Sequence, residues 1–265
     1  MILEVDSLSF AYGQRDVLQN VSFSAFSGNL VAVLGPNGVG KSTLFRCILG
    51  MLKPRTGKIR VDGRDISSMS RHELSGCMAY IPQSSAPVFD YTVLDTVLMG
   101  TTGALPLLSS PKEAQKQAAL EALEALGISH LRERSICRIS GGERQLALIA
   151  RALVQQAKLL VMDEPTANLD YGNQNRVMER IRSLAEQGYL ILLSTHNPEH
   201  ALLFSNQVMA LAQGRLAAFG ATETTLTPEL LGSLYGMRVA ICTQTVEERR
   251  FRLCVPLRSD REASK

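Results

Sequence analysis

The sequence has few cysteines, and their arrangement excludes the disulfide and zinc frameworks of small secreted domains. Their number is odd, and no two of them form a Cys-x-x-Cys pair. This spacing is typical of neither a disulfide scaffold nor a zinc site, and it favours a reducing compartment. The five cysteines are Cys47, Cys77, Cys137, Cys242 and Cys254.

The start of the sequence shows no pattern typical of a signal peptide, and no long apolar run is present. Its start, MILEVDSLSFAYG, carries acidic residues and no basic segment ahead of an apolar stretch, so we expect no signal peptide. No window reaches about 18 uninterrupted apolar residues, the length that marks a membrane-spanning helix, so we expect no transmembrane segment.

An excess of one charge is missing as well. Lys and Arg number 28 against 25 Asp and Glu, which gives a net charge of +3. This excess is too small to indicate a nucleic-acid partner. The length of 265 residues and the hydrophobic share of 45% suit one large domain or two small ones with a sizeable core, and no internal repeat is present.

The sequence does contain an alternation of strand-like and helix-like segments. Its first thirty residues alternate between apolar and polar, which predicts two half-buried antiparallel strands with turns at Gly13 and Gly28. Continuous apolar runs predict strands buried on both faces at 30–35, 77–83, 159–165 and 189–197. Helical patterns occupy 41–52, 112–126, 143–157 and 173–188, and a hairpin is predicted around Gly214.

Buried strands that alternate with helices predict an open α/β sheet whose ligand site lies beyond the carboxyl ends of its strands. Four of the predicted strands end at polar or glycine positions, namely Gly35, Gln83, Asp163 with Glu164, and His196. We therefore expect these side chains to meet at one edge of the sheet.

The stretch GPNGVGKST at 35–43 fits the phosphate-binding pattern G-x-x-x-x-G-K-[ST], and it stands between a predicted strand and a predicted helix. Glycines let backbone N–H groups wrap a phosphate, Lys41 can reach the β and γ phosphates, and the Ser42 hydroxyl can bind Mg²⁺. A plain glycine-rich turn would need neither the lysine nor the hydroxyl.

The strand LLVMDEP supplies acidic partners for such a site. Asp163 ends the strand and can contact Mg²⁺, and Glu164 can accept a proton from an attacking water. Taken alone, the same residues could simply be a strand end that faces solvent.

The stretch ISGGERQ at 139–145 has two readings. Ser140 and Glu143 match a capping box at the start of a helix, but that does not account for the two glycines between them. A bare helix N-terminus is alternatively a phosphate site. From this stretch alone both readings stay open.

These ordered motifs resemble the nucleotide-binding subunits of ABC transporters over residues 2–220. The resemblance implies an α/β P-loop NTPase with a RecA-like core, an N-terminal antiparallel β subdomain and an inserted α-helical subdomain at about 87–157. The ATPase domain would span 1–221, followed by a C-terminal extension at 222–265.

The resemblance also assigns roles to residues. Tyr12 stands where the family stacks a ring on adenine, Gln83 and His196 are the γ-phosphate sensors, and Glu164 is the base that acts with Lys41. Mg²⁺ would be held by Ser42, Gln83 and Asp163. Ser140, Gly141, Gly142 and Glu143 would bind ATP held by a second subunit, and Asp170 of the sequence NLD would lie in the loop that crosses the dimer interface. ATP itself would be bound by Tyr12 and by Gly35, Pro36, Asn37, Gly38, Val39, Gly40, Lys41, Ser42 and Thr43.

The implied protein is a homodimeric ATPase, with ATP and Mg²⁺ as cofactors, bound peripherally to the cytoplasmic face of the inner membrane through two multi-span permease subunits. A substrate-binding protein would be an indirect partner, and no nucleic acid is expected. The stretches YTVLDTVLMG and TPELLGSLYGMRV resemble importers of iron–siderophore, haem, cobalamin or molybdate. An exporter subunit and a soluble ABC ATPase remain as alternatives.

Several expectations concern single residues. Glu143 stands where the family usually has glutamine, so its carboxylate should be turned away from the phosphates or paired with Arg144. The segment 84–111 is expected to dock the permease through apolar residues, although the same residues could form a helical core. His72, His130 and His200 belong to no motif and are expected at the surface. The apolar residues of 84–111 are Val88, Phe89, Tyr91, Val93 and Leu94.

Overall fold

The computed structural model describes residues 1–83, 89–104 and 111–257. Its strands are β1 (Ile2–Tyr12), β2 (Arg15–Phe26), β3 (Leu30–Leu34), β4 (Thr56–Val61), β5 (Arg64–Asp65), β6 (Met78–Ile81), β7 (Leu159–Asp163), β8 (Leu190–Ser194), β9 (Gln207–Ala212), β10 (Arg215–Ala221), β11 (Val239–Val246) and β12 (Arg249–Pro256). Its α-helices are α1 (Lys41–Ile48), α2 (Arg71–Cys77), α3 (Val93–Leu98), α4 (Glu113–Ala125), α5 (Gly141–Leu153), α6 (Tyr171–Glu186), α7 (Pro198–Phe204), α8 (Thr222–Thr225) and α9 (Pro228–Tyr235). The 3₁₀ turns are η1 (Ile66–Ser68), η2 (Met99–Ala104), η3 (Ser129–Leu131) and η4 (Ile136–Arg138).

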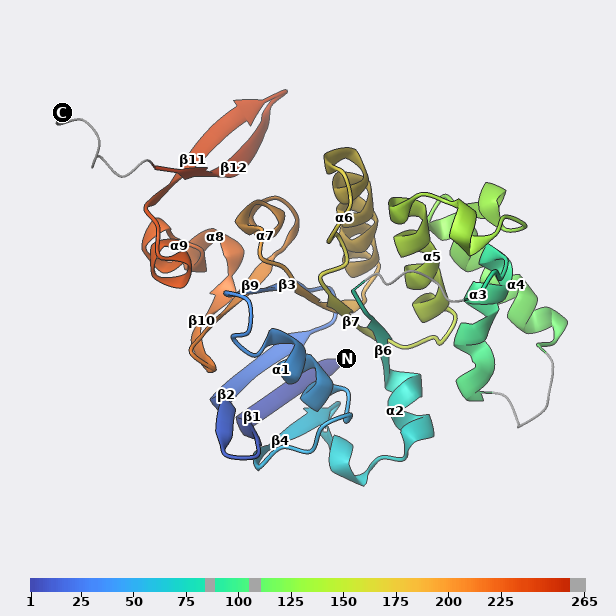
Figure 1. Cartoon of the computed structure of the whole chain (residues 1–265), viewed down its shortest axis with the longest axis horizontal. Helices are drawn as coiled ribbons and strands as arrows, with labels where there is room; N and C mark the ends of the chain where they lie inside the picture. Colours follow the sequence, from blue (N-terminus) through green and yellow to red (C-terminus); the bar gives the residue numbers. More distant parts are fainter. Residues whose placement is uncertain (84–88, 105–110, 258–265) are drawn as a thin grey trace.

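Two sheets lie next to each other (Figure 1). The first has the order β2-β1-β4-β5 and is antiparallel throughout. The second has the order β10-β9-β3-β8-β7-β6, and all its neighbouring strands run parallel except β10, which pairs antiparallel with β9. The carboxyl ends of β3, β6, β7 and β8 therefore share one edge, as the sequence predicted.

The burial of each strand follows its sequence pattern. Strands β3, β7 and β8 are buried at every residue, because helices and the first sheet cover both faces. Strands β1 and β2 alternate between buried and exposed side chains, because only one face meets the core. The expected strands and the hairpin around Gly214 are thus confirmed.

Three apolar clusters hold the layers together. One lies between the two sheets and includes Leu44 and Phe45 of α1. A second joins α3, α4, α5 and α6 to the face of β6, β7 and β8; α3, α4 and α5 lie on the right of Figure 1, and α6 stands between them and α7. A third packs α7 and α9 on β3 and β9. The sheet edge that carries the polar strand ends is therefore held by rigid elements on both sides.

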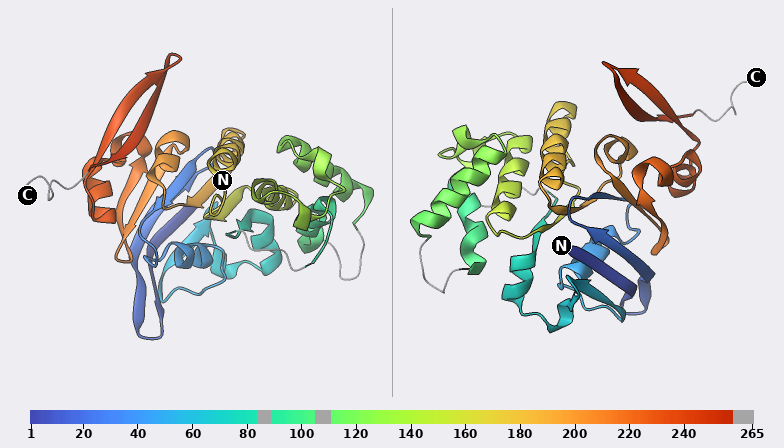
Figure 2. Two further views of the ribbon diagram at one scale, coloured as in Figure 1. Left: turned by 45° about the horizontal axis from the view of Figure 1, so that its top comes forward. Right: turned by 180° about the vertical axis from the view of Figure 1, so that it is seen from behind.

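The C-terminal residues form a hairpin that the sequence did not predict. Strands β11 and β12 pair antiparallel from Val239 to Pro256, and the tip of their hairpin projects beyond the main body in both views of Figure 2. Val239, Ile241 and Cys254 pack the hairpin against the third cluster. The guanidinium of Arg252 fastens the hairpin by donating to the carbonyls of Thr222, Glu223 and Leu226. In the described part of the chain, no helix combines the length and apolar character needed to cross a membrane.

One helix boundary needs correction, and the two readings of the apolar residues in 84–111 can be compared. The helix predicted at 143–157 spans Gly141–Leu153, because Ser140 caps it and both glycines form its first turn. Val93 is fully buried and Leu94 is partly buried against the second cluster, which favours the alternative of a helical core for these two residues. Phe89 and Tyr91 are exposed, and Val88 lies outside the described residues.

The expectation for His200 was also wrong. Its side chain is 7% exposed, because α7 turns this residue towards the sheet, next to the buried Ala201. Its Nδ1 lies 3.4 Å from the Thr166 hydroxyl. Burial lowers the pKa of this imidazole, with a smaller contribution from His196.

Candidate functional site

The loop between β3 and α1 has a backbone that only glycine fits. Gly35 and Gly40 have φ values of 151° and 114°. A Cβ on Gly35 would lie 2.5 Å from the Leu211 carbonyl oxygen, and one on Gly40 would lie 2.9 Å from the Leu18 side chain. The loop is therefore pressed between α1 and its neighbours, and its backbone N–H groups are left free of side chains at the start of a helix.

Lys41 is the first residue of α1, and its ammonium curls back into this loop. The Nζ donates to the carbonyl of Gly35 at 2.6 Å and to that of Pro36 at 3.2 Å. Burial lowers the pKa of the amine, and the nearby carboxylates of Glu164 and Asp163 oppose that shift. The charge is thus held at the centre of the loop, where a phosphate group could exchange with the two carbonyls.

The acidic pair after β7 is fixed by a residue that sequence reasoning missed. Ser194 ends β8 directly opposite Asp163. Its hydroxyl donates to Oδ1 of Asp163 at 2.6 Å and accepts from the backbone N–H of Glu164 at 2.9 Å. One side chain therefore orients both acidic residues. The only signal was a lone polar residue at the end of a fully apolar strand.

Glu164 has a strained backbone. Its φ is 46°, a left-handed conformation that costs a residue other than glycine about 1–3 kcal/mol. This turn aims the carboxylate at the sheet edge, where its Oε1 lies 3.5 Å from Nδ1 of His196. The Glu164 side chain is 18% exposed and that of His196 is 62% exposed, so the pair stands at the mouth of the site.

Two adjoining cavities open at this edge, and Gln83 and Glu164 line both of them. The larger one has a volume of about 590 Å³, which is the size of a typical small-molecule site. It also contains Tyr12, Asn37, Gly38, Gly40, Lys41, Ser42, Thr43 and Asp163. The smaller one, of about 330 Å³, contains His196, Asn168 and the buried Thr166–His200 pair. The structure thus brings the sequence-predicted catalytic and phosphate-contacting side chains together.

The donor set at the larger cavity fits Mg²⁺ better than a transition metal. Among the described residues, no three His, Cys, Asp or Glu side chains gather as a metal cage. The cavity offers the Ser42 hydroxyl, the Gln83 amide and the Asp163 carboxylate, of which the last is 9% exposed. Mg²⁺ prefers oxygen ligands and usually keeps part of its shell for phosphate and water. These three side chains would hold the ion beside the phosphates.

Tyr12 presents an exposed ring at the rim of the larger cavity. It is 47% exposed, and its ring meets that of Phe10 edge to face, with the centroids 4.8 Å apart. Phe10 is buried and supports the Tyr12 ring on the side that faces the protein. One face of Tyr12 is therefore available to stack on a base.

Replacing Tyr12 by alanine is expected to weaken nucleotide binding, whereas Tyr12→Phe should bind normally. Stacking of a base on an aromatic ring contributes on the order of 1–3 kcal/mol, which is about 5- to 150-fold in Kd. Calorimetric titration with ATP measures the effect. An equal loss in both variants would mean that the hydroxyl, not the ring face, contacts the nucleotide.

Ser140 and the residues after it form a complete helix cap. The Ser140 hydroxyl accepts from the Glu143 backbone N–H at 3.3 Å, and Glu143 Oε2 accepts from the Ser140 N–H at 2.8 Å. Hydrogen bonds that the backbone N–H and the side chain of Ser140 make with this carboxylate lower the pKa of Glu143. Arg144 instead donates to the carbonyls of Ile136 and Ile139, so of the two expected alternatives for Glu143 the structure does not show the pairing with Arg144. The carboxylate is turned into the cap.

The capped segment does not contribute to the cavities of its own chain. Ser140, Gly141, Gly142 and Glu143 line neither of them. In Figure 1, α5 lies in the helical group, with β6 and β7 between it and α1.

Asp170 of the sequence NLD caps α6. Its Oδ1 accepts from the Asn173 backbone N–H at 2.9 Å, and its Oδ2 accepts from the Asn173 side-chain amide at 2.7 Å. These bonds lower the pKa of Asp170. Asn168, two residues earlier, has a φ of 62°, so the loop turns sharply before the helix and leaves Tyr171 76% exposed.

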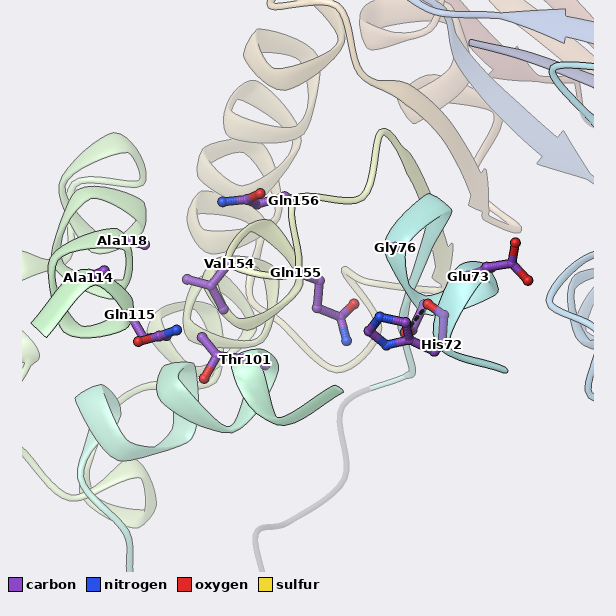
Figure 3. Close-up of a pocket in the computed structure, with 12 residues that line it drawn as sticks. His72, Glu73, Gly76, Thr101, Ala114, Gln115, Ala118, Val154, Gln155 and Gln156 are labelled. Carbon is purple, nitrogen blue, oxygen red and sulfur yellow. Dashed lines mark hydrogen bonds between the residues drawn. The ribbon is translucent and has the colours of Figure 1, made fainter. Parts of the chain in front are cut away.

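A third hollow lies away from the nucleotide cavities, between α2, η2, α4 and the end of α5 (Figure 3). It has a volume of about 420 Å³. His72 lies on one side, and Thr101 and Gln115 lie on the other. The Oε1 of Gln155 is buried there and has no hydrogen-bond partner within the described chain. We call this hollow the interlobe groove.

The chain is similar to known proteins along most of its length. The family model described as ABC transporter matches residues 18–167. An uncharacterized ABC transporter ATP-binding protein of Haemophilus influenzae is 40% identical over 235 residues, which are 89% of each chain. A protein of Helicobacter pylori named for iron chelatin transport ATP binding is 37% identical over 237 residues, 89% of this chain and 93% of its own.

The fold is similar to that of a solved structure over almost the whole chain. That structure is an ABC transporter, assigned to the metal-chelate type, in an inward-facing conformation. It superposes with a TM-score of 0.86 at 35% identity and covers 97% of both chains. The match therefore includes the C-terminal residues beyond β10 as well as both sheets and the helical group.

Proposed function

The chain belongs to the ABC transporter ATP-binding family, and from that premise we propose that it powers the import of a metal chelate by hydrolysing ATP at the edge of its six-stranded sheet. It is the ATP-binding subunit of an ABC importer. One observation carries the site assignment: Lys41, Asp163 and Glu164 line a single cavity with the phosphate loop.

The chemistry follows from the positions of these groups. The γ-phosphate takes the place of the carbonyls that now accept from Lys41, whose ammonium then offsets the charge that grows on the phosphate oxygens. Glu164 orients the attacking water or accepts its proton. His196, whose Nδ1 lies 3.5 Å from Oε1 of Glu164, is placed to contact the phosphate. Mg²⁺ supplies further charge neutralisation when it is bound.

We place the active form as a homodimer with two ATP molecules at the interface. Ser140 and Gly141 are exposed at a capped helix start, and the Ser140–Gly142 segment lies outside its own chain's cavities, which supports a role in the partner's site. The sharp turn at Asn168 belongs to a loop that could cross between the two chains, and the exposed ring of Tyr171 begins the helix that follows. Hydrolysis would remove the phosphates that join them.

The interlobe groove is where we place the permease. It joins two helical parts of the molecule, and its wall includes Gly100 and Thr101 of the segment 84–111. The unpartnered Gln155 Oε1 could accept a hydrogen bond from an inserted segment, which would remove the cost of leaving it buried and unsatisfied. Binding there would attach the chain peripherally to the cytoplasmic face of the membrane.

The substrate class follows from the relatives, since one is named for iron chelatin transport and the solved structure is assigned to the metal-chelate type. The expected result is uptake of a radiolabelled ferric chelate by proteoliposomes that contain the chain, its permease and internal ATP with Mg²⁺. A substrate-binding protein added outside should stimulate uptake. Uptake of another metal compound, with none of the ferric chelate, would overturn this assignment.

A variant in the interlobe groove tests the docking site in the same assay. Ala118→Arg places a long charged side chain in the groove, so uptake and copurification with the permease should fall at least tenfold, while ATP binding by the isolated chain stays normal. Glu124→Arg, on the exposed face of the same helix, is the matched control. Normal uptake by Ala118→Arg would place the permease elsewhere.

A further inference from the structure

The two glycines of the ISGGERQ stretch pack tightly against another part of the same chain. A Cβ on Gly141 would lie 2.9 Å from the Leu169 Cδ2 atom. A Cβ on Gly142 would lie 2.7 Å from Oδ1, 2.8 Å from Cγ and 2.9 Å from Cβ of Asn173. Contacts below about 3 Å do not occur without movement, so either α5 or the Asn173 side chain would have to shift with alanine at 142.

Asn173 touches both motifs. On one side its side chain lies against the backbone of Gly142, which is buried. On the other its amide nitrogen donates to Oδ2 of Asp170, and its backbone N–H donates to Oδ1 of the same carboxylate. Arg176 donates to the Oδ1 atom of Asn173 at 3.4 Å. The Asn173 side chain is therefore held in one orientation between Asp170 and Gly142.

We propose that Asn173 is a positioning residue that makes the Ser140–Gly142 segment and the Asp170 loop of one chain move as a single unit. The inference rests on the proposed dimer, in which both motifs face the partner. The Asn173 side chain, which Asp170 holds in place, limits how closely the start of α5 can approach α6. A displacement of the loop by the partner would then be transmitted to the phosphate-binding N–H groups.

The proposal explains in a second way why position 142 is glycine, because the residue must fit against Asn173 as well as let a phosphate approach its backbone. If the glycine is needed only because a phosphate sits against its backbone, alanine at 142 should be harmful whatever stands at 173. If the Asn173 side chain is the obstacle, truncating it to alanine should remove the two shortest contacts of the added methyl group, those with Oδ1 and Cγ, and leave only the 2.9 Å contact with the Asn173 Cβ. A double-mutant cycle separates the two explanations, since residues in contact show non-additive effects.

The experiment uses the full chain with Glu164→Gln as the common background, and it measures ATP-dependent dimer formation by mass photometry. We expect Gly142→Ala to weaken the dimer at least tenfold, and Asn173→Ala to weaken it about threefold to tenfold through loss of the Asp170 contact. The Gly142→Ala, Asn173→Ala double variant should dimerise better than Gly142→Ala alone. The affinity of each monomer for ATP, measured by calorimetry, should not change, since neither residue lines the larger nucleotide cavity.

Asn175→Ala is the matched control, because this amide lies on the same helix but donates to the Tyr171 carbonyl instead of touching Gly142. A double variant no better than Gly142→Ala alone, both with Asn173→Ala and with Asn173→Gly, which also removes the Cβ, would overturn the proposal and leave phosphate access as the reason for the glycine. Dimerisation of Asn173→Ala at the background level would also overturn it. Failure of the Glu164→Gln background itself to dimerise would instead contradict the proposed homodimer.

Discussion

Replacement of Glu164 by glutamine is expected to stop ATP hydrolysis while ATP still binds. The amide keeps the shape of the side chain, and the backbone N–H at 164 can still donate to the Ser194 hydroxyl. What is lost is the proton acceptor, whose contribution to such reactions is roughly 10²–10⁴ in rate. Because the phosphates are then not removed, the variant should elute as a dimer in the presence of ATP.

Phosphate release measures the rate, and light scattering coupled to gel filtration measures the dimer. Glu179→Gln is the matched control, because it neutralises an exposed carboxylate on α6, outside both nucleotide cavities. Hydrolysis at the unmodified rate in Glu164→Gln would show that another group accepts the proton. His196 would then be the first candidate, because it lies beside the same carboxylate.

Loss of the Lys41 ammonium is expected to impair binding and hydrolysis together. In Lys41→Ala, the charge-assisted bonds to the β and γ phosphates disappear, and each contributes roughly 1.5–3 kcal/mol. The Kd for ATP should therefore rise by about one to two orders of magnitude per bond. Calorimetry gives the affinity, and phosphate release gives the rate.

Lys53→Ala removes the same charge from an exposed position and should leave both quantities unchanged. Because Lys41 also ties down the carbonyls of Gly35 and Pro36, thermal unfolding of Lys41→Ala should be recorded alongside. A variant that unfolds normally and binds ATP with unaltered affinity would contradict the assignment of Lys41 to the phosphates.

The strands and the phosphate loop could be predicted because their signals are local. An apolar run such as LVAVL has to be buried on both faces, and the glycines and lysine that follow it have no other common use. The shared edge of the sheet then followed from topology, because the strand ends of parallel neighbours must meet. The fold class and the membership in the ABC family were both confirmed on this basis.

Contacts between distant residues could not be predicted in this way. Ser194 orients Asp163 across 31 positions, and Asn173 packs on Gly142 across a similar interval, but neither residue belongs to a recognisable pattern. His200 was misplaced because it belongs to no motif, whereas one helical turn carries it inward. Surface and core stayed open for Val93 and Leu94 because the periodicity of a six-residue helix is too short to read.

The left-handed backbone at Glu164 lowers the stability of the fold, whereas its carboxylate is needed for the reaction. Glycine would adopt this conformation freely, so Glu164→Gly would relieve local strain of about 1–3 kcal/mol while removing the proton acceptor. Substitution of Glu164 by glycine is therefore favourable for folding, and only selection for ATP turnover opposes it. In a copy of the chain that served merely as an ATP-held clamp, the glutamate would be among the first residues to disappear.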